Sequence, residues 1–431
     1  MIGPMQSTFI EHTLPNGLRV VCEVMPRVRS AAAGFFVRTG SRHERPHEHG
    51  VSHFLEHMCF KGTPRRSWHD INVRFDELGS IYNAYTSKER TVYYGWVPAA
   101  RIEPQIELLA DMMRPSLPPD DFETERNVIL EEIAMSGDSF EHFVWNALHE
   151  VCFGDHPLAH EVLGEQETIA KLPREVMVEY HRRRYTPDNM VLVVAGGIDP
   201  DEVFAAAGRY CGHWNRDTVA EGAVCDPPPP PTGQHVRTSD RFAQQSLVLA
   251  YPAVPEGHRL TETIEVFQAA FGGRNSRCFW NIVQKGICAA AGALWLAYRD
   301  TGLMVLYADG EPDRCEAMLD ALRAQAREVG ERGFADEEVR RVKNRRRTHL
   351  ALEAENPRTR LMQLMDDLEA GGYARSADAR LAAVEAVRST GISGYLDRYP
   401  ITGEGVLISC GPRRWPERCA ETSAVAGSVV L

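Results

Sequence analysis

The segment GVSHFLEHMCFKG, residues 50–62, carries most of what can be inferred about this chain. His53 and His57 are four residues apart, so on a helix they lie on one face and can bind the same ion. Neutral imidazoles suit Zn²⁺. Glu56 lies at the edge of that face, where it can accept a proton from a water activated by the metal. The segment therefore predicts a helix with two zinc ligands and a general base.

An alternative interpretation is a surface helix with two histidines of no special role. The apolar residues Phe54, Leu55, Met58 and Phe60 favour a helix that is packed largely against the protein interior. Buried histidines beside a buried glutamate need a partner, and a metal ion supplies one. Cys59 lies about 200° around the helix from the second histidine, so we expect its thiol to point away from the ion.

A third ligand is expected, because catalytic zinc usually has three protein ligands and one open position. The segment ERNVILEEI, residues 125–133, offers candidates. Glu125 and Glu132 are two helical turns apart and share a face, whereas Glu131 lies about 100° away. We expect Glu132 to bind the metal and Glu125 to orient a zinc-bound histidine. The spacing alone leaves open an exposed acidic helix without ligands.

The composition is that of an ordinary globular protein, with 43% hydrophobic and 25% charged residues. Its 431 residues favour two domains of about 200 residues each. No apolar run approaches the roughly 18 residues that span a membrane, and the first residues lack the order of a secretory signal. Ten cysteines are scattered singly, which is typical of reduced thiols. We expect a cytoplasmic protein, or a periplasmic one if a signal has been removed.

The net charge of −12 is concentrated in the first half of the chain. Residues 1–225 carry 22 Lys and Arg against 33 Asp and Glu, whereas residues 226–431 carry 26 against 27. An acidic surface disfavours nucleic acid as a partner and attracts cationic peptides. A solvated acidic surface that only aids solubility explains the same imbalance.

Five consecutive prolines, Pro227–Pro231, indicate a domain boundary near the middle of the chain. Such a run cannot join a helix or a central strand, so we expect a semi-rigid spacer. The predicted organisation is a zinc-binding domain over residues 1–225, a linker over 226–234 and a second domain over 235–431.

Weak internal similarity suggests that the two halves are duplicates of one design. Arg184-Tyr185 precedes the apolar run 190–195, and Arg398-Tyr399 precedes the apolar run 406–409. The second pair lies 214 residues after the first. We therefore expect two homologous domains.

Each half mixes expected strands with expected helices in an irregular order, which favours an α+β fold with mainly antiparallel sheets over a doubly wound one. The expected strands are residues 18–24, 32–37, 91–97, 190–195, 245–251, 303–307 and 406–410. The expected helices are residues 52–60, 102–113, 119–135, 315–330 and one long stretch from 335 to about 370.

These segments resemble the pitrilysin/insulinase family of zinc peptidases, and in particular its short-chain branch that includes mitochondrial processing peptidase. The His-x-x-Glu-His order is the inverted zinc motif of the inverzincins. The similarity covers almost the whole chain. Further matching segments are LPNGLRVV (residues 14–21), LGSIYNAYTSKERTVYY (residues 78–94) and YTPDNMVLVVAGGID (residues 185–199). The resemblance implies an endopeptidase with one zinc ion per chain, and it agrees with Glu132 as the third ligand.

The resemblance also implies how a substrate binds. The segment Asn83–Thr86 matches the edge strand on which family members lay an extended peptide, so Asn83 and Ala84 are the expected peptide-binding residues. Such β-augmentation takes its affinity from main-chain hydrogen bonds. An ordinary polar strand edge is the alternative.

The chain departs from the family pattern in its second half. Active members usually carry an Arg and a Tyr, seven residues apart, that stabilise the oxyanion. Here Val283 occupies the Arg position, Ala289 or Ala290 the Tyr position, and no arginine occurs from residue 278 to 298. The resemblance therefore implies a heterodimer in which a homologous partner donates both groups. The alternatives are a non-catalytic structural subunit and a homodimeric processing peptidase.

Overall fold

The structure of the chain is a computed structural model that describes residues 7–215, 232–403, 405–417 and 420–421. The expected proline linker, Pro227–Pro231, lies outside these residues. The described chain divides into two compact units, and each has a mixed six-stranded sheet with helices packed on it. The expected α+β class is confirmed.

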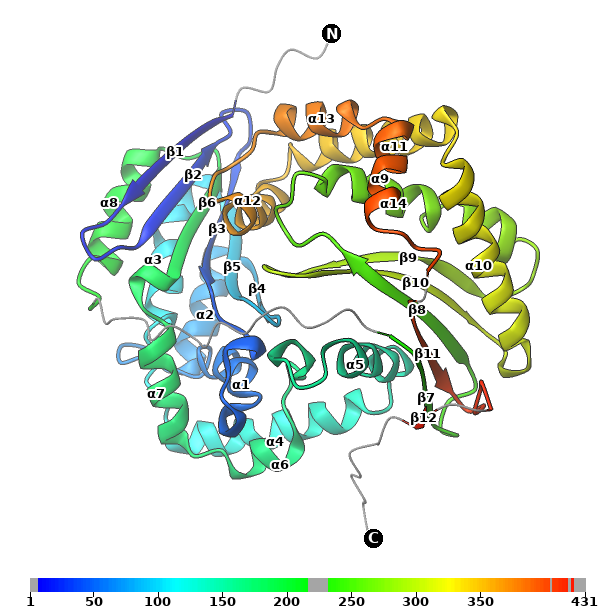
Figure 1. Cartoon of the computed structure of the whole chain (residues 1–431). Coiled ribbons are helices and arrows are strands. Elements are labelled where there is room, and N and C mark those ends of the chain that lie inside the picture. Colours follow the sequence, from blue (N-terminus) through cyan, green and yellow to red (C-terminus); the bar gives the residue numbers. More distant parts are fainter. Residues whose placement is uncertain (1–6, 216–231, 404, 418–419, 422–431) are drawn as a thin grey trace. The chain divides into compact units, whose positions relative to one another are not determined.

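The first unit is built on a sheet with the strand order β1-β2-β6-β3-β5-β4 (Figure 1). Strand β2 pairs with β6 in parallel, and all other neighbours are antiparallel. The register places Phe35 opposite Tyr93 and Val21 opposite Val193. The strands are β1 (Thr8–Thr13), β2 (Arg19–Val24), β3 (Ser30–Val37), β4 (Ile81–Thr86), β5 (Thr91–Pro98) and β6 (Met190–Gly196).

Both faces of this sheet are buried. Alternate residues of the central strands point to opposite sides, so each strand contributes to two cores. Along β2, Val20 and Cys22 belong to one core and Val21 to another. Along β6, Leu192 and Val193 are divided in the same way. A one-residue shift of register would exchange the two apolar sets, so the packing specifies the pairing.

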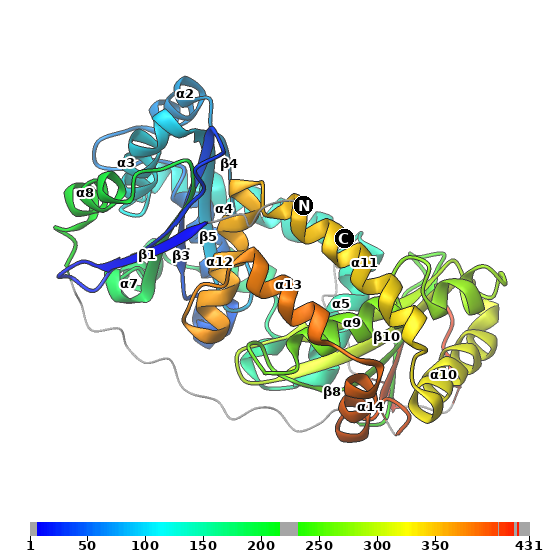
Figure 2. The same cartoon turned by 90° about the horizontal axis from the view of Figure 1, so that it is seen from above.

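Helices cover both faces. Figure 2 shows α2, α3 and α8 on one face of the sheet and α12 on the other. The α-helices of this unit are α1 (Val51–Met58), α2 (Trp68–Leu78), α3 (Ile102–Met112), α4 (Pro119–Ser136), α6 (Gln166–Lys171), α7 (Arg174–Arg184), α8 (Pro200–Cys211) and α12 (Pro357–Gly371).

The second unit repeats this plan with the strand order β12-β7-β11-β8-β10-β9. Strand β7 is parallel to β11, and β11, β8, β10 and β9 are successively antiparallel. The sheets differ at one edge, where β12 pairs with β7 in parallel and β1 pairs with β2 antiparallel. The strands are β7 (Gln234–Thr238), β8 (Gln245–Ala253), β9 (Ala290–Ala297), β10 (Gly302–Gly310), β11 (Val406–Gly411) and β12 (Ala420–Glu421).

Helix α10 packs against β8 and β10, α9 packs against β9, and α5 packs against β8 and β11. The helices of this unit are α5 (Phe140–Phe153), α9 (Thr261–Phe271), the π-helical segment η6 (Phe279–Val283), α10 (Cys315–Arg332), α11 (Asp336–Glu353), α13 (Ala377–Ala386) and α14 (Ser389–Arg398). The last residues of α11 and the first of α13 are assigned to the first unit.

Each unit takes a helix from the other half of the sequence. Residues 350–378, which contain α12, belong to the first unit, and residues 136–159, which contain α5, belong to the second. Leu361 and Leu364 of α12 join the core formed by alternate residues of β2, β3 and β6. Ala147 and Leu148 of α5 join the core of the second sheet. The units therefore do not follow the contiguous ranges 1–225 and 235–431.

The expected long helix from Ala335 to about Ala370 is wrong, because the chain forms α11 and α12 with a break between them. Asn356 is the N-cap of α12, and its side chain accepts from the N–H groups of Arg358 and Thr359. Pro357 follows at the first helical position, where its missing N–H costs nothing. An Asn-Pro pair therefore starts a new helix.

No helix in the described residues has the length and apolar character needed to cross a bilayer. Eight cysteines lie within the described residues, and all of them are buried free thiols.

Candidate metal centre

Helix α1 begins at a tightly packed left-handed glycine. Gly50 has φ 89°, and a Cβ there would lie 2.8 Å from the carbonyl oxygen of Leu163 and 2.9 Å from Cα of Gly164. The buried carboxylate of Glu44 accepts from the N–H groups of Gly50 and Ser52, both at 2.8 Å. It thereby satisfies donors that the first turn of a helix leaves free.

Apolar packing fixes α1 against α4. Phe54, Leu55 and Met58 are fully buried, which confirms that the helix faces the interior. The ring of Phe54 stacks on that of Phe122 in α4, with 4.6 Å between centroids. This contact places the two segments that carry the expected ligands side by side.

The structure brings His53, His57 and Glu132 together. Nε2 of His53 and Nε2 of His57 each lie 3.8 Å from Oε2 of Glu132. One ligand atom from each residue can be chosen so that all three lie within 4.8 Å of one another. Glu131, the neighbouring carboxylate on α4, is exposed, as the helical geometry predicts. Two residues of α1 and one of α4 therefore form a compact donor set.

This donor set fits a zinc ion. Ligand atoms at about 2.1 Å from one ion are about 3.4 Å apart at the tetrahedral angle. Small side-chain shifts would bring the two imidazole nitrogens and the Glu132 oxygen to this separation. Burial and the neighbouring His57 lower the pKa of His53 to about 4, which keeps its imidazole neutral, the form that binds a metal. Nδ1 of His53 is buried and has no hydrogen-bond partner among the described residues.

Glu125 holds one of the two histidines in place. Nδ1 of His57 lies 2.8 Å from Oε1 of Glu125, and Oε2 of Glu125 lies 2.5 Å from Nζ of Lys61. Burial alone would raise the pKa of Glu125, but the bonds to His57 and Lys61 outweigh it and lower the pKa. The ionised carboxylate accepts the N–H at Nδ1, which leaves Nε2 of His57 free to act as a ligand.

Burial alone would lower the pKa of His57. Its bond to Glu125 and the nearby carboxylates of Glu132 and Glu56 outweigh this effect and raise the pKa. The two histidines thus have opposite pKa shifts, because burial and the neighbouring imidazole dominate at His53, whereas His57 is bonded to Glu125 and lies near two more carboxylates. A cation placed among these carboxylates would compete with the proton of His57.

Glu56 is buried, with 8% of its surface exposed. The hydroxyl of Thr86, the last residue of β4, donates to Oε2 of Glu56 at 2.6 Å. Burial raises the pKa of Glu56, and the bond from Thr86 partly opposes the rise. A carboxylate with a raised pKa, held beside two histidines, has the properties of a general base.

Strand β4 lies at the edge of its sheet, as expected for Asn83 and Ala84. The side chain of Asn83 is exposed and Ala84 is 9% exposed. Oδ1 of Asn83 accepts from the N–H of Ala84 at 2.9 Å. Thr86 connects this edge directly to Glu56.

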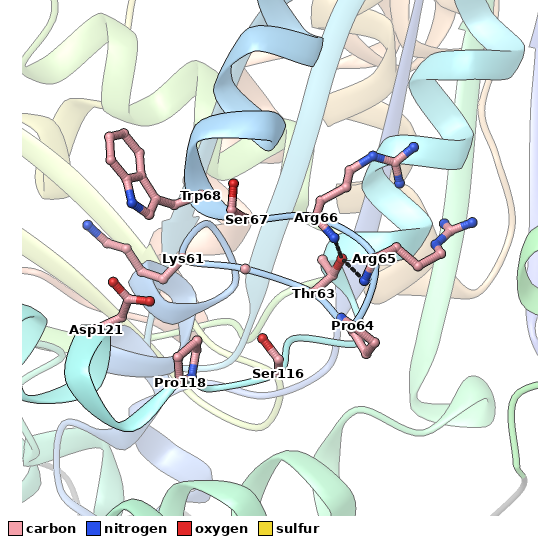
Figure 3. A pocket seen from close by; sticks show the side chains of 11 residues that line it. Lys61, Thr63, Pro64, Arg65, Arg66, Ser67, Trp68, Ser116, Pro118 and Asp121 are labelled. Carbon is pink, nitrogen blue, oxygen red and sulfur yellow. Dashed lines mark hydrogen bonds between the residues drawn. The ribbon is translucent and has the colours of Figure 1, made fainter.

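A pocket of about 350 Å³ lies beside the loop between α1 and α2 (Figure 3). Oγ1 of Thr63 accepts from the N–H groups of Arg65 and Arg66 at 3.1 Å and 3.0 Å. Both arginine side chains form ion pairs with Glu107 and Asp111. These contacts hold the loop that follows Lys61.

Three residues of this site were missed by the sequence reasoning. Thr86 lies within the quoted edge segment, but nothing in the sequence indicates that it bonds to Glu56. Lys61 is four residues after His57, but α1 ends at Met58, so helical spacing does not predict this contact. Glu44 lies outside every motif and gives no signal.

The segment in which the resemblance expects an Arg and a Tyr spans η6 and the start of β9. Val283 ends η6, and Ala290 begins β9. The arginine that precedes it, Arg277, makes two bonds of 2.9 Å to the carboxylate of Glu338.

Two family models match the chain. One, described as insulinase (peptidase family M16), matches residues 19–166, and one described as peptidase M16 inactive domain matches residues 171–346. An uncharacterized zinc protease of Mycobacterium leprae is 34% identical over 84% of this chain and 82% of its own length. Another, from Bacillus subtilis, is 29% identical over 93% of this chain and 98% of its own.

Solved structures share the fold. A protease from Helicobacter pylori has a TM-score of 0.87 at 18% identity, covering 94% of this chain and 100% of its own. A peptidase M16 inactive domain from Pseudomonas fluorescens has a TM-score of 0.85 at 16% identity, covering 94% of this chain and 98% of its own.

Proposed function

The chain belongs to peptidase family M16, the insulinase family, and on that premise we propose that it is the zinc-bearing subunit of an endopeptidase. The observation that carries the proposal is the donor set of His53, His57 and Glu132, with Glu56 beside it. The proposed ligands come from two helices that pack together through Phe54 and Phe122.

The expected reaction is hydrolysis of a peptide bond. A zinc ion held by the three ligands would lower the pKa of a water molecule and polarise the substrate carbonyl. Glu56 accepts the proton of that water and later delivers it to the leaving amine. Thr86 orients the carboxylate of Glu56 through its hydrogen bond. Glu125 and Lys61 fix the orientation of His57.

The expected substrate is an extended or unfolded peptide. Strand β4 ends its sheet, and an edge strand can pair with a peptide through main-chain hydrogen bonds. Asn83 and Ala84 are the proposed contact residues. Because Thr86 of the same strand is bonded to Glu56, a peptide paired along β4 would run toward the general base.

The proposed active unit contains a second, homologous chain. Arg and Tyr are missing from residues 279–290, where the family pattern has them, and Arg277 is already bound to Glu338. A partner would supply the donors that stabilise the oxyanion.

Zinc binding can be tested with two neighbouring carboxylates. Glu132→Gln is expected to lower the zinc content of purified protein well below one ion per chain, because one of three ligands is weakened. Glu131→Gln removes an exposed carboxylate from the same helix and should leave the zinc content unchanged. Metal analysis after gel filtration measures both. Equal zinc contents in the two variants would contradict the assignment.

The partner requirement needs a separate assay. Peptide cleavage is measured for the purified chain alone and after mixing with a homologous M16 chain from the same organism, with Glu56→Gln as the inactive control. We expect cleavage only in the mixture. Full cleavage by the isolated chain would support a homodimer, and zinc-free protein that stays inactive in the mixture would support a structural subunit.

A further inference from the structure

A second polar cluster lies in the second unit, on helix α11 (Asp336–Glu353). Basic residues occupy six of the eight positions from Arg340 to Arg347. Like charges one turn apart on a helix repel each other and destabilise it by a few tenths of a kcal/mol per pair. Nothing in the metal centre uses this concentration of charge.

Part of α11 lines a cavity of about 260 Å³. The other walls come from α9, the loop before η6, η6 itself and α10. Arg341 and Arg345, four residues apart, both line it, and so does Arg277. Two carboxylates, Glu328 and Glu338, line the same cavity.

Arg277 contacts both carboxylates. Its Nε and Nη2 donate to the two oxygens of Glu338 at 2.9 Å each, and its Nη1 lies 3.3 Å from Glu328. Burial alone would raise the pKa of Glu338, but the bond to Arg277 outweighs it and lowers the pKa. Arg277 is therefore engaged with both acidic groups of the wall, whereas Arg345 is left for a ligand.

Arg345 is the free cation of this wall. In the part of the chain that the structure describes, no hydrogen bond or ion pair engages its guanidinium. Burial and the charge of Arg341 both lower the pKa of Arg345. Arg341 forms an ion pair with Glu337 at 3.2 Å on the exposed side of the helix, and its charge also lowers the pKa of Glu338. Two arginines in mutual repulsion thus face one cavity.

Neutral donors complete the wall. Ser276 is buried, and its Oγ accepts from the N–H of Phe279 at 3.3 Å, which leaves its O–H free to donate. The backbone of Asn275 has φ 56°, and its side chain has no hydrogen-bond partner within the described ranges. Trp280, 54% exposed, contributes an aromatic surface at the rim.

We propose that this cavity binds a small tetrahedral oxyanion of the phosphate type, either free phosphate or the phosphoryl group of a small molecule. Guanidinium groups bind such anions with paired, charge-assisted hydrogen bonds. The cavity is smaller than the roughly 300–1,000 Å³ that encloses a drug-sized ligand. It therefore holds a phosphoryl group, and any attached group lies outside, next to Trp280.

The test uses the full chain and inorganic phosphate. Phosphate is expected to raise the unfolding temperature and to give saturable heat in calorimetry. Arg345→Gln should weaken binding about tenfold or more, since a hydrogen bond to a charged group contributes about 1.5–3 kcal/mol. Arg340→Gln removes an equal charge from the same helix, outside the cavity, and should bind like the wild type.

Loss of folding can be separated from loss of binding. Without phosphate, Arg345→Gln should unfold at the same or a higher temperature than the wild type, because a like-charge pair is removed. Arg341→Gln is the second variant and should also weaken binding. AMP in place of phosphate distinguishes the sources: binding at least as tight as phosphate indicates a phosphoryl compound, and weaker binding indicates the free anion.

Absence of saturable phosphate binding to the wild type would overturn the proposal, as would equal weakening by Arg345→Gln and Arg340→Gln. Neither zinc nor peptide cleavage enters these measurements. The proposal of an oxyanion site and the proposal of a peptidase function can therefore be contradicted independently of each other.

Discussion

In the first unit the chain runs from β3 through α1 and α2 to β4 and β5, and in the second it runs from β8 through α9 and η6 to β9 and β10. These strands pair in the same order and directions in both units, yet the helices carry different chemistry. Helix α1 has His53, Glu56 and His57, whereas α9 contains no histidine or cysteine. Helix α4 presents carboxylates, and α11, its counterpart in chain order, presents arginines.

The first turns of α1 and α9 also differ in the side chains that bond to them. A buried carboxyl group, Glu44, caps α1. At α9, the hydroxyl of Thr261 donates to the carbonyl of His258, and Nδ1 of His258 accepts from the N–H of Leu260. The comparison teaches that one strand topology supports both arrangements. The metal chemistry depends on a few side chains on two helices.

The most severe test of the comparison removes Glu56, which has no counterpart on α9. In the assembly that cleaves peptides, Glu56→Gln is expected to lower kcat about 10²–10⁴-fold, because the proton acceptor is lost. Zinc content should stay unchanged, since Glu56 is not a ligand. A quenched fluorescent peptide and metal analysis measure the two effects. Loss of zinc from this variant would move Glu56 into the ligand set.

The next test compares a carboxylate of α4, Glu125, with a carboxylate of α11, Glu338. Glu125→Gln is expected to lower zinc affinity about 10–100-fold, because His57 loses the acceptor that orients it. Glu338→Gln on α11 is the matched control and should leave zinc affinity at the wild-type value. Competition with a chromophoric chelator measures both. Lys61→Met should have a smaller effect in the same direction, and an affinity loss with Glu338→Gln would contradict the separation of the two sites.

The cap of α1 predicts a pH dependence of stability. Burial raises the pKa of Glu44 from 4.5 to about 8, so between these pH values the folded state keeps a proton that the unfolded state releases. The stabilisation is complete below about pH 4.5 and is lost as the pH rises through about 8. Relative to Glu44→Gln, the wild type should lose on the order of 1–3 kcal/mol of unfolding free energy between pH 5 and pH 9.

Urea unfolding of the zinc-free proteins at several pH values measures this difference. Thr261→Ala, at the start of α9, changes a helix without a carboxylate cap and should keep the wild-type pH dependence. Parallel pH profiles for the wild type and Glu44→Gln would show that Glu44 has the same protonation in both states.

The smallest expected effect belongs to Thr86. Thr86→Val removes the hydroxyl that donates to Glu56, so the pKa of Glu56 rises further and less of it is ionised at acidic pH. The acid limb of the pH–rate profile should shift to higher pH, and kcat near neutrality should fall a few-fold. Thr86→Ser keeps the hydroxyl and should restore the profile. An unshifted acid limb would exclude this role for Thr86.

Local spacing was sufficient to single out the candidate ligands, which the structure brings within 4.8 Å of one another. His53 and His57, and likewise Glu125 and Glu132, lie on common helix faces, and the periodicity of an α-helix fixes these relations without distant contacts. The α+β class followed in the same way from the order of apolar patterns. The break before Pro357 could also have been found, since Asn-Pro is a strong signal for the start of a helix.

Other features depend on contacts between residues far apart in the sequence. The sequence alone determined which side chains can bind a metal, because that is a matter of residue type and helical period. Only the tertiary structure decided that α5 packs in the second unit and α12 in the first. It also decided that Thr86 and Lys61 contact the site, and that Arg345 faces a cavity. Apolar faces accept any partner of suitable shape, and hydrogen-bond partners are chosen by packing, which no local pattern encodes.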